Sequence, residues 1–299
     1  MKHKYIPYQA KNILYRFDEI NKFYKARYSL NPYRGCMVGC RYCYVQLKRY
    51  ADSTGLEEKK AQMMEIKINA PYLLKQKLKN NLRAEMIVIG ESCEPYGKAE
   101  EKYLITRRLL EILANHNFPV HIVTRFGQVI KDIELLKKIN ERSFACVTVS
   151  IPVVSKKLVN KLEGDSPKVK ERFKTVKELN KHGIASGIAL NPVIPYISDG
   201  EEINKVFKKA VKYNTSYVLY NPLTIKHYQK KMFICWLEDK YPRLVASYKR
   251  LYSDNELPDK EYREKFFKQF KQKALSLNLN LEVPYEPENS YSQKILDIK

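Results

Sequence analysis

The chain lacks the features that mark membrane-spanning and secreted proteins. It has no run of about 18 apolar residues, so the sequence predicts no transmembrane helix. Its N-terminal segment, MKHKYIPYQAKN, is polar and no apolar stretch follows it, which indicates no secretory signal. Its six cysteines are too scattered for a disulfide framework, and a chain of 299 residues can bury an ample core without one. We therefore expect a protein of the reducing cytoplasm.

Acidic residues are scarce relative to basic ones. The chain has 33 Asp and Glu against 55 Lys and Arg, a net charge of +22. Residues 1–50 hold 11 basic residues against two acidic ones, with nine tyrosines among them, and residues 226–275 hold 13 against seven. Basic residues interleaved with aromatic ones suit a polyanion whose phosphates are neutralised and whose bases are stacked. Nucleic acid is therefore one expected partner, and a solvated, lysine-rich surface is the alternative.

Linkers, internal repeats and low-complexity tracts are absent as well. The predicted organisation is an N-terminal extension (1–27), a core (28–222) and a helical tail packed on the core (223–299). We expect a helix over 17–26 in the extension. In the tail we expect amphipathic helices over 226–277 with a break around Pro258, followed by an edge strand in LNLEVPY.

Short apolar runs alternate with longer amphipathic stretches within the core. The apolar runs predict strands and the amphipathic stretches predict helices. The expected strands are the approach to Gly35, 84–90, 119–124, 144–151, 184–190 and 216–220, with an extra strand at 64–69; the expected helices are 99–116, 128–140, 168–182 and 200–213. Near-continuous apolar strands that alternate with helices are typical of a parallel sheet buried on both faces. Six such units predict an α/β fold, a partial (β/α)6 TIM-like barrel, with its chemistry at the carboxyl ends of the strands.

Three of the six cysteines fall within eight residues. Cys36, Cys40 and Cys43 stand in the string NPYRGCMVGCRYCY, and no fourth cysteine follows within the same loop. Thiolates this close in sequence usually hold a soft metal or an iron–sulfur cluster. Three protein ligands would leave one iron of a cubane open for chemistry. Zinc is the alternative, but it needs four ligands, and the chain's Cys-x2-Cys pair is limited to Cys40 and Cys43.

The pattern Cys-x3-Cys-x-Tyr-Cys, with Tyr42 before the last cysteine, resembles the signature of the radical S-adenosylmethionine (SAM) enzymes. The longer string resembles one branch of them, the spore photoproduct lyase-like proteins, which read close to NPYRGC-x2-GC-x-YCY. Further matches follow in the expected order along the chain: EIKINAPYLLKQKL at 65–78, EPYGKAEEKYLITRRLLEIL at 94–113, LEGDSPKVKERF at 162–173 and GIALNPVIPYISD from Gly187. The resemblance thus extends through most of the chain.

This resemblance implies two cofactors and a reaction. The cofactors are a [4Fe–4S] cluster on Cys36, Cys40 and Cys43, and SAM, whose amino and carboxylate groups would chelate the open iron. One-electron reduction by a donor such as flavodoxin or ferredoxin would cleave SAM to a 5′-deoxyadenosyl radical. Abstraction of hydrogen from an unidentified substrate would follow, and the relative that names the branch acts on DNA.

The resemblance also implies SAM contacts at the ends of the strands. Tyr42 belongs to the cluster loop, and Cys93 and Glu94 stand where relatives usually have Thr or Ser and then Asp, close to the methionine amino group. Arg125 follows the third strand, where relatives commonly have Lys, and its planar guanidinium suits the methionine carboxylate. Ser150, at the end of the fourth strand, is placed to donate to the ribose hydroxyls.

A second pair of residues also follows a pattern similar to that of the family. Glu163 and Arg172 are expected to form an ion pair that closes over the site. The alternative is a solvated pair that contributes little to stability.

Cys93 also has a catalytic interpretation. A thiol beside SAM could donate a hydrogen atom to a product radical, as a cysteine does in the lyase, although the lyase's donor corresponds to a position nearer Glu91. A small half-buried residue that fills space is the alternative. Tyr96 is a second candidate for a radical relay. Of the remaining cysteines, Cys146 is expected in the core and Cys235 is expected to pack on an amphipathic helix.

The predicted function is therefore that of a radical SAM enzyme, a lyase or a modifying enzyme, with repair of a pyrimidine photolesion as its most concrete version. The alternative is a non-catalytic iron–sulfur or zinc protein that binds nucleic acid through its basic face.

Overall fold

The fold comes from a computed structural model that describes residues 4–43, 63–80, 82–253 and 255–286. Its strands are β1 (Lys4–Tyr8), β2 (Leu14–Asn21), β3 (Ala26–Leu30), β4 (Tyr33–Arg34), β5 (Met63–Lys67), β6 (Ile87–Ile89), β7 (Val120–Thr124), β8 (Ala145–Ser150), β9 (Ala185–Val193) and β10 (Val218–Pro222). Its helices are α3 (Ala70–Leu78), α4 (Lys98–Tyr103), α5 (Ile105–Leu113), α6 (Ile133–Arg142), α7 (Lys156–Leu162), α8 (Val169–Lys181), α9 (Glu201–Lys212), α10 (His227–Lys240), α11 (Val245–Tyr252) and α12 (Lys260–Leu275), with 3-10 turns η1 (Gly127–Asp132) and η2 (Pro242–Leu244).

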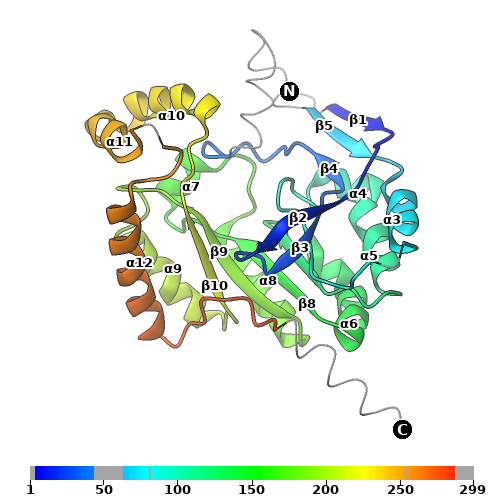
Figure 1. The fold of residues 1–299 in the computed structure, drawn as a ribbon. Coiled ribbons are helices and arrows are strands. Elements are labelled where there is room, and N and C mark those ends of the chain that lie inside the picture. The colour runs from blue at the N-terminus through cyan, green and yellow to red at the C-terminus, as the bar shows by residue number, and fades with distance from the viewer. Residues whose placement is uncertain (1–3, 44–62, 81, 254, 287–299) are drawn as a thin grey trace.

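Seven strands form the larger sheet, in the order β10-β9-β8-β7-β6-β3-β2. All neighbouring pairs in it are parallel except β2 and β3, which run antiparallel at one edge. β6 and β7 are buried at every residue, as expected of strands covered on both faces. The sheet curls into part of a barrel with helices around it (Figure 1). The predicted fold, a partial (β/α)6 TIM-like barrel, is confirmed.

The helix predicted over 17–26 is wrong, because this segment forms the end of β2 and a turn. The Asn21 side chain accepts hydrogen bonds from the backbone N–H groups of Phe23 and Tyr24, both at 3.1 Å. Lys25 adopts φ +52°. An asparagine that caps its own turn competes with helix formation, and a residue in the left-handed region ends a helix. β2 can therefore turn back and pair with β3.

The smaller sheet, β1-β5-β4, positions the start of the cysteine loop, defined as residues 35–43. β5 agrees with the extra strand predicted at 64–69. β4 pairs with β5 in antiparallel register, with Tyr33 opposite Ile66. Gly35 then forms an isolated bridge with Cys93, which follows β6. These pairings tie the first residue of the loop to both sheets.

The helices agree with the predicted ranges, with four differences, the first of which is that α3 was not predicted. The helix predicted over 99–116 is divided into α4 and α5, because Leu104 adopts φ +50° between them. The helix predicted over 128–140 begins as the turn η1 before α6. The short helix α7 was not predicted, since its seven residues are too few to show a helical period. Within the ranges described, no helix combines the length and apolar character needed to span a membrane.

The tail is helical, as predicted, and α11 and α12 are separated around Pro258. α12 lies beside β10 and α9 (Figure 1). The Phe270 ring packs against Tyr220 and Phe207, with ring centroids 4.5 and 4.9 Å away. Aromatic packing of this kind attaches the tail to the edge of the barrel.

The edge strand predicted in LNLEVPY is wrong. The segment is irregular, although the Asn280 carbonyl accepts a hydrogen bond from Val218 N–H at 2.7 Å at the start of β10. Pro284 has no N–H to donate to a ladder, which limits strand pairing here.

The described residues form three hydrophobic cores. One surrounds Cys146 and Tyr217 and includes Tyr24 and Val123 of the cavity lining; the other two contain the barrel wall and the cysteine loop. The larger of these two fills the barrel wall, between the strands and the helices outside them. The smaller one, called the cysteine-loop core, joins the cysteine loop to α7, to segments that follow β8, β9 and β10, and to α10 and α11. Its buried members are Val38, Cys40, Tyr42, Val153, Leu162, Ile194, Leu223, Ile225, Phe233, Leu237, Tyr248, Leu251 and Tyr252. Residues far apart in sequence therefore hold the loop.

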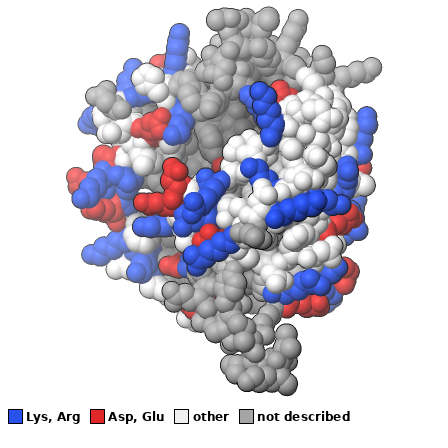
Figure 2. Space-filling view, turned by 45° about the vertical axis from the view of Figure 1, so that its right-hand side comes forward, with Lys and Arg blue, Asp and Glu red and all other residues white. Residues whose placement is uncertain are grey.

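The surface is basic, but its cations are partly paired. On the face seen in Figure 2, Lys and Arg are interleaved with Asp and Glu. Within the basic N-terminal block, three cations have acidic partners: Lys25 with Glu282 at 2.6 Å, Arg27 with Glu85 at 3.5 Å and Arg34 with Glu65 at 3.5 Å. Pairing of this kind reduces the charge that the block presents to a polyanion.

Candidate active site

The three loop cysteines line one cavity of about 370 Å³. Residues at or near the carboxyl ends of five parallel strands also line it: Gly90, Thr124, Ser150, Asn191 and Pro222. The cavity therefore lies at the carboxyl ends of the strands, the position at which such barrels carry their chemistry. The cysteine loop is on the face of the barrel predicted for it.

The three thiols are soft sulfur donors that line one cavity. Cys40 is buried, and Cys36 and Cys43 are half-buried. Among the residues that the structure describes, no three His, Cys, Asp or Glu side chains converge on a position for one metal ion. In a cubane each thiolate bonds a different iron, so the thiolates stand apart around the cluster. Three soft sulfur donors around one cavity therefore fit a [4Fe–4S] cluster.

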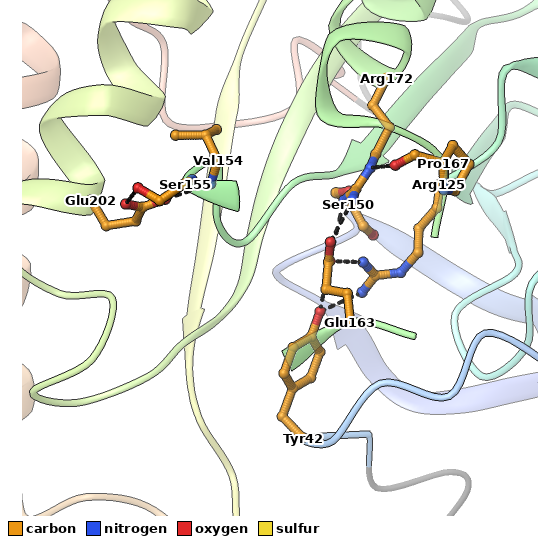
Figure 3. Close-up of polar contacts among 9 residues, drawn as sticks. All are labelled: Tyr42, Arg125, Ser150, Val154, Ser155, Glu163, Pro167, Arg172 and Glu202. Carbon is orange, nitrogen blue, oxygen red and sulfur yellow. Dashed lines mark hydrogen bonds and ion pairs between the residues drawn. The ribbon is translucent and has the colours of Figure 1, made fainter. Parts of the chain in front are cut away.

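A buried carboxylate connects the cysteine loop to the barrel. Glu163, which follows α7, accepts hydrogen bonds from Tyr42 Oη at 3.0 Å, from Arg125 and from both terminal nitrogens of Arg172 (Figure 3). Arg125 also donates to Tyr42 Oη at 2.8 Å. The Glu163 and Arg172 side chains are fully buried. The expected ion pair is therefore present, and it is not the solvated pair of the alternative interpretation.

The two guanidinium groups keep this carboxylate ionised. Burial alone would raise the pKa of Glu163, but Arg125 and Arg172 together hold it below its ordinary value. Arg172 is itself oriented by backbone carbonyls: its Nε donates to Pro167 O at 2.8 Å and its NH1 to Ser150 O at 3.1 Å. One carboxylate between two guanidinium groups leaves net positive charge beside the cavity.

Gly164 lets the segment after α7 lie directly on the cysteine loop. Arg41 N–H donates to Leu162 O at 2.9 Å, and Asp165 N–H donates to Val38 O at 2.7 Å. A Cβ at position 164 would overlap the Val38 carbonyl oxygen. Glycine is therefore required in the string LEGDSP, a requirement that appears only when the two segments are seen in contact.

Glu94 joins the ends of β6 and β7. Its carboxylate accepts hydrogen bonds from Thr124 Oγ1, from Tyr96 N–H at 3.0 Å and from Arg125 N–H at 2.9 Å. Burial raises the pKa of Glu94, while these donors oppose the shift. Gly90 makes the turn after β6, since its φ is +90° and a Cβ there would lie 2.5 Å from a backbone oxygen of β7.

Cys93 is buried at the cavity wall beside Asn31. Cys93 Sγ lies 3.5 Å from Asn31 Oδ1, and Ser92 N–H donates to the same oxygen at 3.1 Å. Lys67 Nζ donates to the Asn31 carbonyl at 2.7 Å. Burial raises the pKa of the Cys93 thiol to about 12, so the thiol keeps its proton at neutral pH. Asn31 stands in the string NPYRGC, but its contact with Cys93 depends on the fold and could not be read from the string.

Two other predicted residues have different surroundings. Ser150 ends β8 and lines the cavity, as expected. Tyr96 does not line this cavity: it is buried, and its hydroxyl donates to Asp132 at 2.9 Å. The geometry therefore supports Ser150 as a ligand-binding residue more than Tyr96 as a relay.

The two remaining cysteines lie away from the cavity. Cys146 is buried in β8, as predicted. Cys235 is exposed on α10, so the prediction that it packs is wrong. The buried positions of α10 are Phe233 and Leu237, which point to the cysteine-loop core.

Part of the cavity lining was not predicted. It includes three asparagines and a lysine: Asn21, Asn191, Asn221 and Lys226. Asn21 ends β2 and Asn221 lies in β10, so the curled sheet brings its two edges to one cavity. Within residues 4–34, no Lys or Arg lines this cavity. The described Lys and Arg residues of the basic N-terminal block, including Arg41, therefore do not line the cavity, although the cysteines of the block do.

Comparison with known families decides the class of the protein. The description "Radical SAM superfamily" belongs to the family whose profile matches residues 30–210, a range that includes the cysteine loop, Arg125, Ser150 and Glu163. The chain belongs to the radical SAM superfamily. The enzyme class predicted from the cysteine pattern is thus confirmed, and the family implies SAM and a [4Fe–4S] cluster as cofactors.

Individual relatives are distant in sequence. An uncharacterised protein of Mycobacterium tuberculosis is 26% identical over 241 residues, which cover 80% of this chain and 71% of the relative. A radical SAM Nα-GlyT isomerase of Pseudomonas phage M6 is 24% identical over 190 residues, which cover 63% of this chain and 38% of the isomerase.

Solved structures share the fold more extensively. A mutant of spore photoproduct lyase has a TM-score of 0.68 at 14% identity, covering 94% of this chain and 82% of that chain. Spore photoproduct lyase complexed with dinucleoside spore photoproduct has a TM-score of 0.65 with the same coverage and identity. The spore photoproduct lyase-like fold predicted from the sequence is therefore confirmed.

Proposed function

We propose that this radical SAM enzyme holds a [4Fe–4S] cluster on Cys36, Cys40 and Cys43 and abstracts hydrogen from a nucleic-acid substrate. The observation that carries the proposal is that the three thiols line one cavity within the region that matches the family. When bound there, the cluster would supply one electron to SAM, whose cleavage would give a 5′-deoxyadenosyl radical. The reducing compartment expected from the sequence suits such a cluster.

Arg125 and Ser150 would bind and orient SAM. The contacts of Arg125 with Glu163 and Tyr42 use two of its five N–H groups, so the guanidinium is fixed and can still receive the methionine carboxylate. Ser150 is at the cavity wall, where its hydroxyl can donate to a ribose oxygen. Tyr42 lies between two proposed cluster ligands and is oriented by Glu163. These groups are ordered before SAM arrives, which reduces the entropy lost on binding.

Cys93 is the proposed hydrogen donor to the product radical. It lines the same cavity as the three loop cysteines, and its thiol remains protonated at neutral pH. An S–H group carries the hydrogen atom that this step needs, and Asn31 Oδ1 lies 3.5 Å from the sulfur and can orient it. Cys93→Ala should therefore retain the cluster and still form 5′-deoxyadenosine, because the donor acts after SAM is cleaved.

The proposed substrate contains a nucleobase. The net charge of +22 favours a polyanion. The amide side chains of Asn191 and Asn221 line the cavity and can pair with the edge of a base. Lys226 also lines the cavity, where it is paired with Glu256 at 2.5 Å. The solved relative in complex with dinucleoside spore photoproduct supports the same substrate class.

Anaerobic reconstitution with iron, sulfide and dithionite tests the function. We expect charge-transfer absorbance at about 400 nm from thiolate-bound iron, and 5′-deoxyadenosine formed from SAM. Cys36→Ala, Cys40→Ala and Cys43→Ala should each abolish 5′-deoxyadenosine formation. Cys235→Ala, which changes an exposed cysteine on α10, is the matched control and should behave as the wild type.

Two outcomes would contradict this function. Bound iron without any 5′-deoxyadenosine would favour a non-catalytic iron–sulfur protein that binds nucleic acid. Tightly bound zinc, with no absorbance from iron, would favour a zinc protein.

A further inference from the structure

A basic and aromatic surface lies on the outer side of the cysteine loop. It comprises Arg41, Lys161, Trp236, Tyr241 and Arg243, and is called the loop patch. Arg41 is exposed on the turn of the loop, and its N–H group bonds to the residue that follows Lys161. Lys161 Nζ lies 4.5 Å from the centre of the Tyr241 ring, which is 5.5 Å from the Trp236 ring. These contacts connect the loop, through the end of α7, to α10 and to Tyr241, which directly precedes η2.

The cations of the loop patch are available to a partner. Arg41 and Arg243 are exposed, and Lys161 is half-buried. None of the three makes an ion pair with an acidic residue in the part of the chain that the structure describes. The exposed acids nearest in sequence are Asp165, Glu238 and Asp239, and Asp239 is paired with Lys240 at 2.8 Å. The loop patch therefore presents net positive charge.

The loop patch and the three thiols share the cysteine-loop core, but the loop patch lies outside the cavity. Trp236 and Tyr241 are half-buried against the cysteine-loop core, which also contacts Cys36 and Cys43 and includes Cys40. No residue of the loop patch lines the cavity. A protein docked here would therefore approach the thiols from outside and leave the cavity open for SAM and substrate.

We propose that the loop patch binds a small acidic electron-transfer protein that reduces the cluster. The inference rests on the proposed function. A flavodoxin in its hydroquinone form would lose one electron and become the semiquinone, and the cluster would gain that electron and pass from the 2+ to the 1+ level, with no bond formed or broken. Complementary charge speeds such encounters, whose interfaces are small. Nucleic acid is less suited to this surface, because its reacting group must enter a cavity that the loop patch does not border.

Binding to the metal-free protein tests the loop patch without any enzymatic activity. The dissociation constant for an acidic flavodoxin is measured by calorimetry at low ionic strength, for the wild type and for the double variant Arg41→Glu/Lys161→Glu. We expect binding about 10-fold weaker in the variant, and weaker binding of the wild type as salt is added. Arg243→Glu, outside the cysteine loop, should weaken binding in the same direction.

The matched control is Lys138→Glu/Arg142→Glu on α6, which is distant from α7 and α10 in Figure 1. It makes the same change of net charge and should leave flavodoxin binding within about twofold of the wild type. Equal binding by the loop-patch variant and the wild type would overturn the proposal. The proposal would also be overturned if the loop-patch variant kept flavodoxin binding but no longer bound a single-stranded oligonucleotide, since the surface would then bind nucleic acid.

A second measurement separates this proposal from the proposed function. In the reconstituted enzyme, photoreduced deazaflavin replaces the protein donor and does not need a docking surface. The loop-patch variant should form 5′-deoxyadenosine as the wild type does with deazaflavin, and about 10-fold more slowly with flavodoxin. If the wild type forms none with either reductant, the proposed function fails, while the binding constants still decide the role of the loop patch.

Discussion

The barrel wall and the cysteine-loop core are built in different ways. In the barrel wall, elements that follow one another in sequence pack side by side through apolar side chains. In the cysteine-loop core, segments spread between residues 38 and 252 meet, and a carboxylate with two guanidinium groups is buried beside them. The wall depends on local patterns, whereas the cysteine-loop core depends on distant partners. We infer that the wall sets global stability and the cysteine-loop core sets the order of the loop.

Glu163→Gln should have the largest effect of the changes considered. It leaves the largely buried guanidinium groups of Arg125 and Arg172 without a carboxylate. Breaking a buried ion pair costs about 3–5 kcal/mol, because a charge remains without a partner. Urea unfolding of the metal-free protein measures this change in the free energy of unfolding.

A surface carboxylate provides the control for this change. Glu178 contacts His182 at 3.5 Å and its side chain is 40% exposed, so Glu178→Gln should alter the free energy of unfolding by less than about 0.5 kcal/mol. If both variants lowered the free energy of unfolding by a similarly small amount, the contacts of Glu163 with Arg125 and Arg172 would not support the fold.

His121 should give the barrel wall a dependence on pH. Its ring bonds to Thr148 Oγ1 at 2.6 Å and to Tyr24 O at 3.0 Å, and burial lowers its pKa from 6.5 to about 4. Between these values the unfolded chain binds a proton that the folded chain does not. Stability should therefore fall as the pH is lowered through this window, by about 3 kcal/mol at pH 4.

Unfolding of the wild type and of His121→Gln at pH 7, 6, 5 and 4 isolates this contribution. The difference between the two proteins should shrink as the pH falls, because only the wild type loses stability through His121, while the acidic groups titrate in both and cancel. A constant difference across this range would contradict the assignment of a neutral, buried His121.

Gly164→Ala should disturb the cysteine-loop core and leave the barrel wall intact. Its Cβ would overlap the Val38 carbonyl, and overpacking of this kind costs about 1–3 kcal/mol. Hydrogen exchange should become faster at the amides of Arg41 and Asp165, which span this contact. Gly200→Ala, which has open space for a Cβ, is the control. Equally faster exchange in β7 and β8 would mean that the two cores unfold together.

Cys235→Ser should have the smallest effect. Cys235 is exposed on α10, outside the cavity. The free energy of unfolding should therefore match that of the wild type within about 0.5 kcal/mol, and the iron content should match within experimental error. Iron analysis of the reconstituted protein checks this expectation. A loss of iron would show that the chain uses a fourth cysteine.

The sequence predicted the barrel more completely than it predicted the support of the cysteine loop. The strands near 119–124 and 144–151 follow from local apolar runs. Such runs predict a buried strand without knowledge of the tertiary contacts. The failed helix over 17–26 had a helical pattern of apolar residues, but the Asn21 turn and the left-handed Lys25 prevented it. Local patterns of apolar residues therefore sufficed to predict a helix or strand where no side chain formed competing hydrogen bonds with the backbone.

The contacts that hold the loop could not be predicted because they are long-range. Arg125 donates to Tyr42, 83 positions earlier, and to Glu163, 38 positions later. The sequence suggested Arg125 as a SAM ligand and Glu163 as the partner of Arg172, but nothing in it connects the two to Tyr42. The need for Gly164 likewise arises from another segment that passes over it.

The central claim is that the cluster on Cys36, Cys40 and Cys43 keeps one iron open for SAM. Electron–nuclear double resonance on the reduced, reconstituted enzyme, with SAM labelled at its amino nitrogen, tests it most directly. The account predicts magnetic coupling between that nitrogen and the cluster. A cluster that shows no coupling to SAM, or a fourth protein ligand on its last iron, would contradict it.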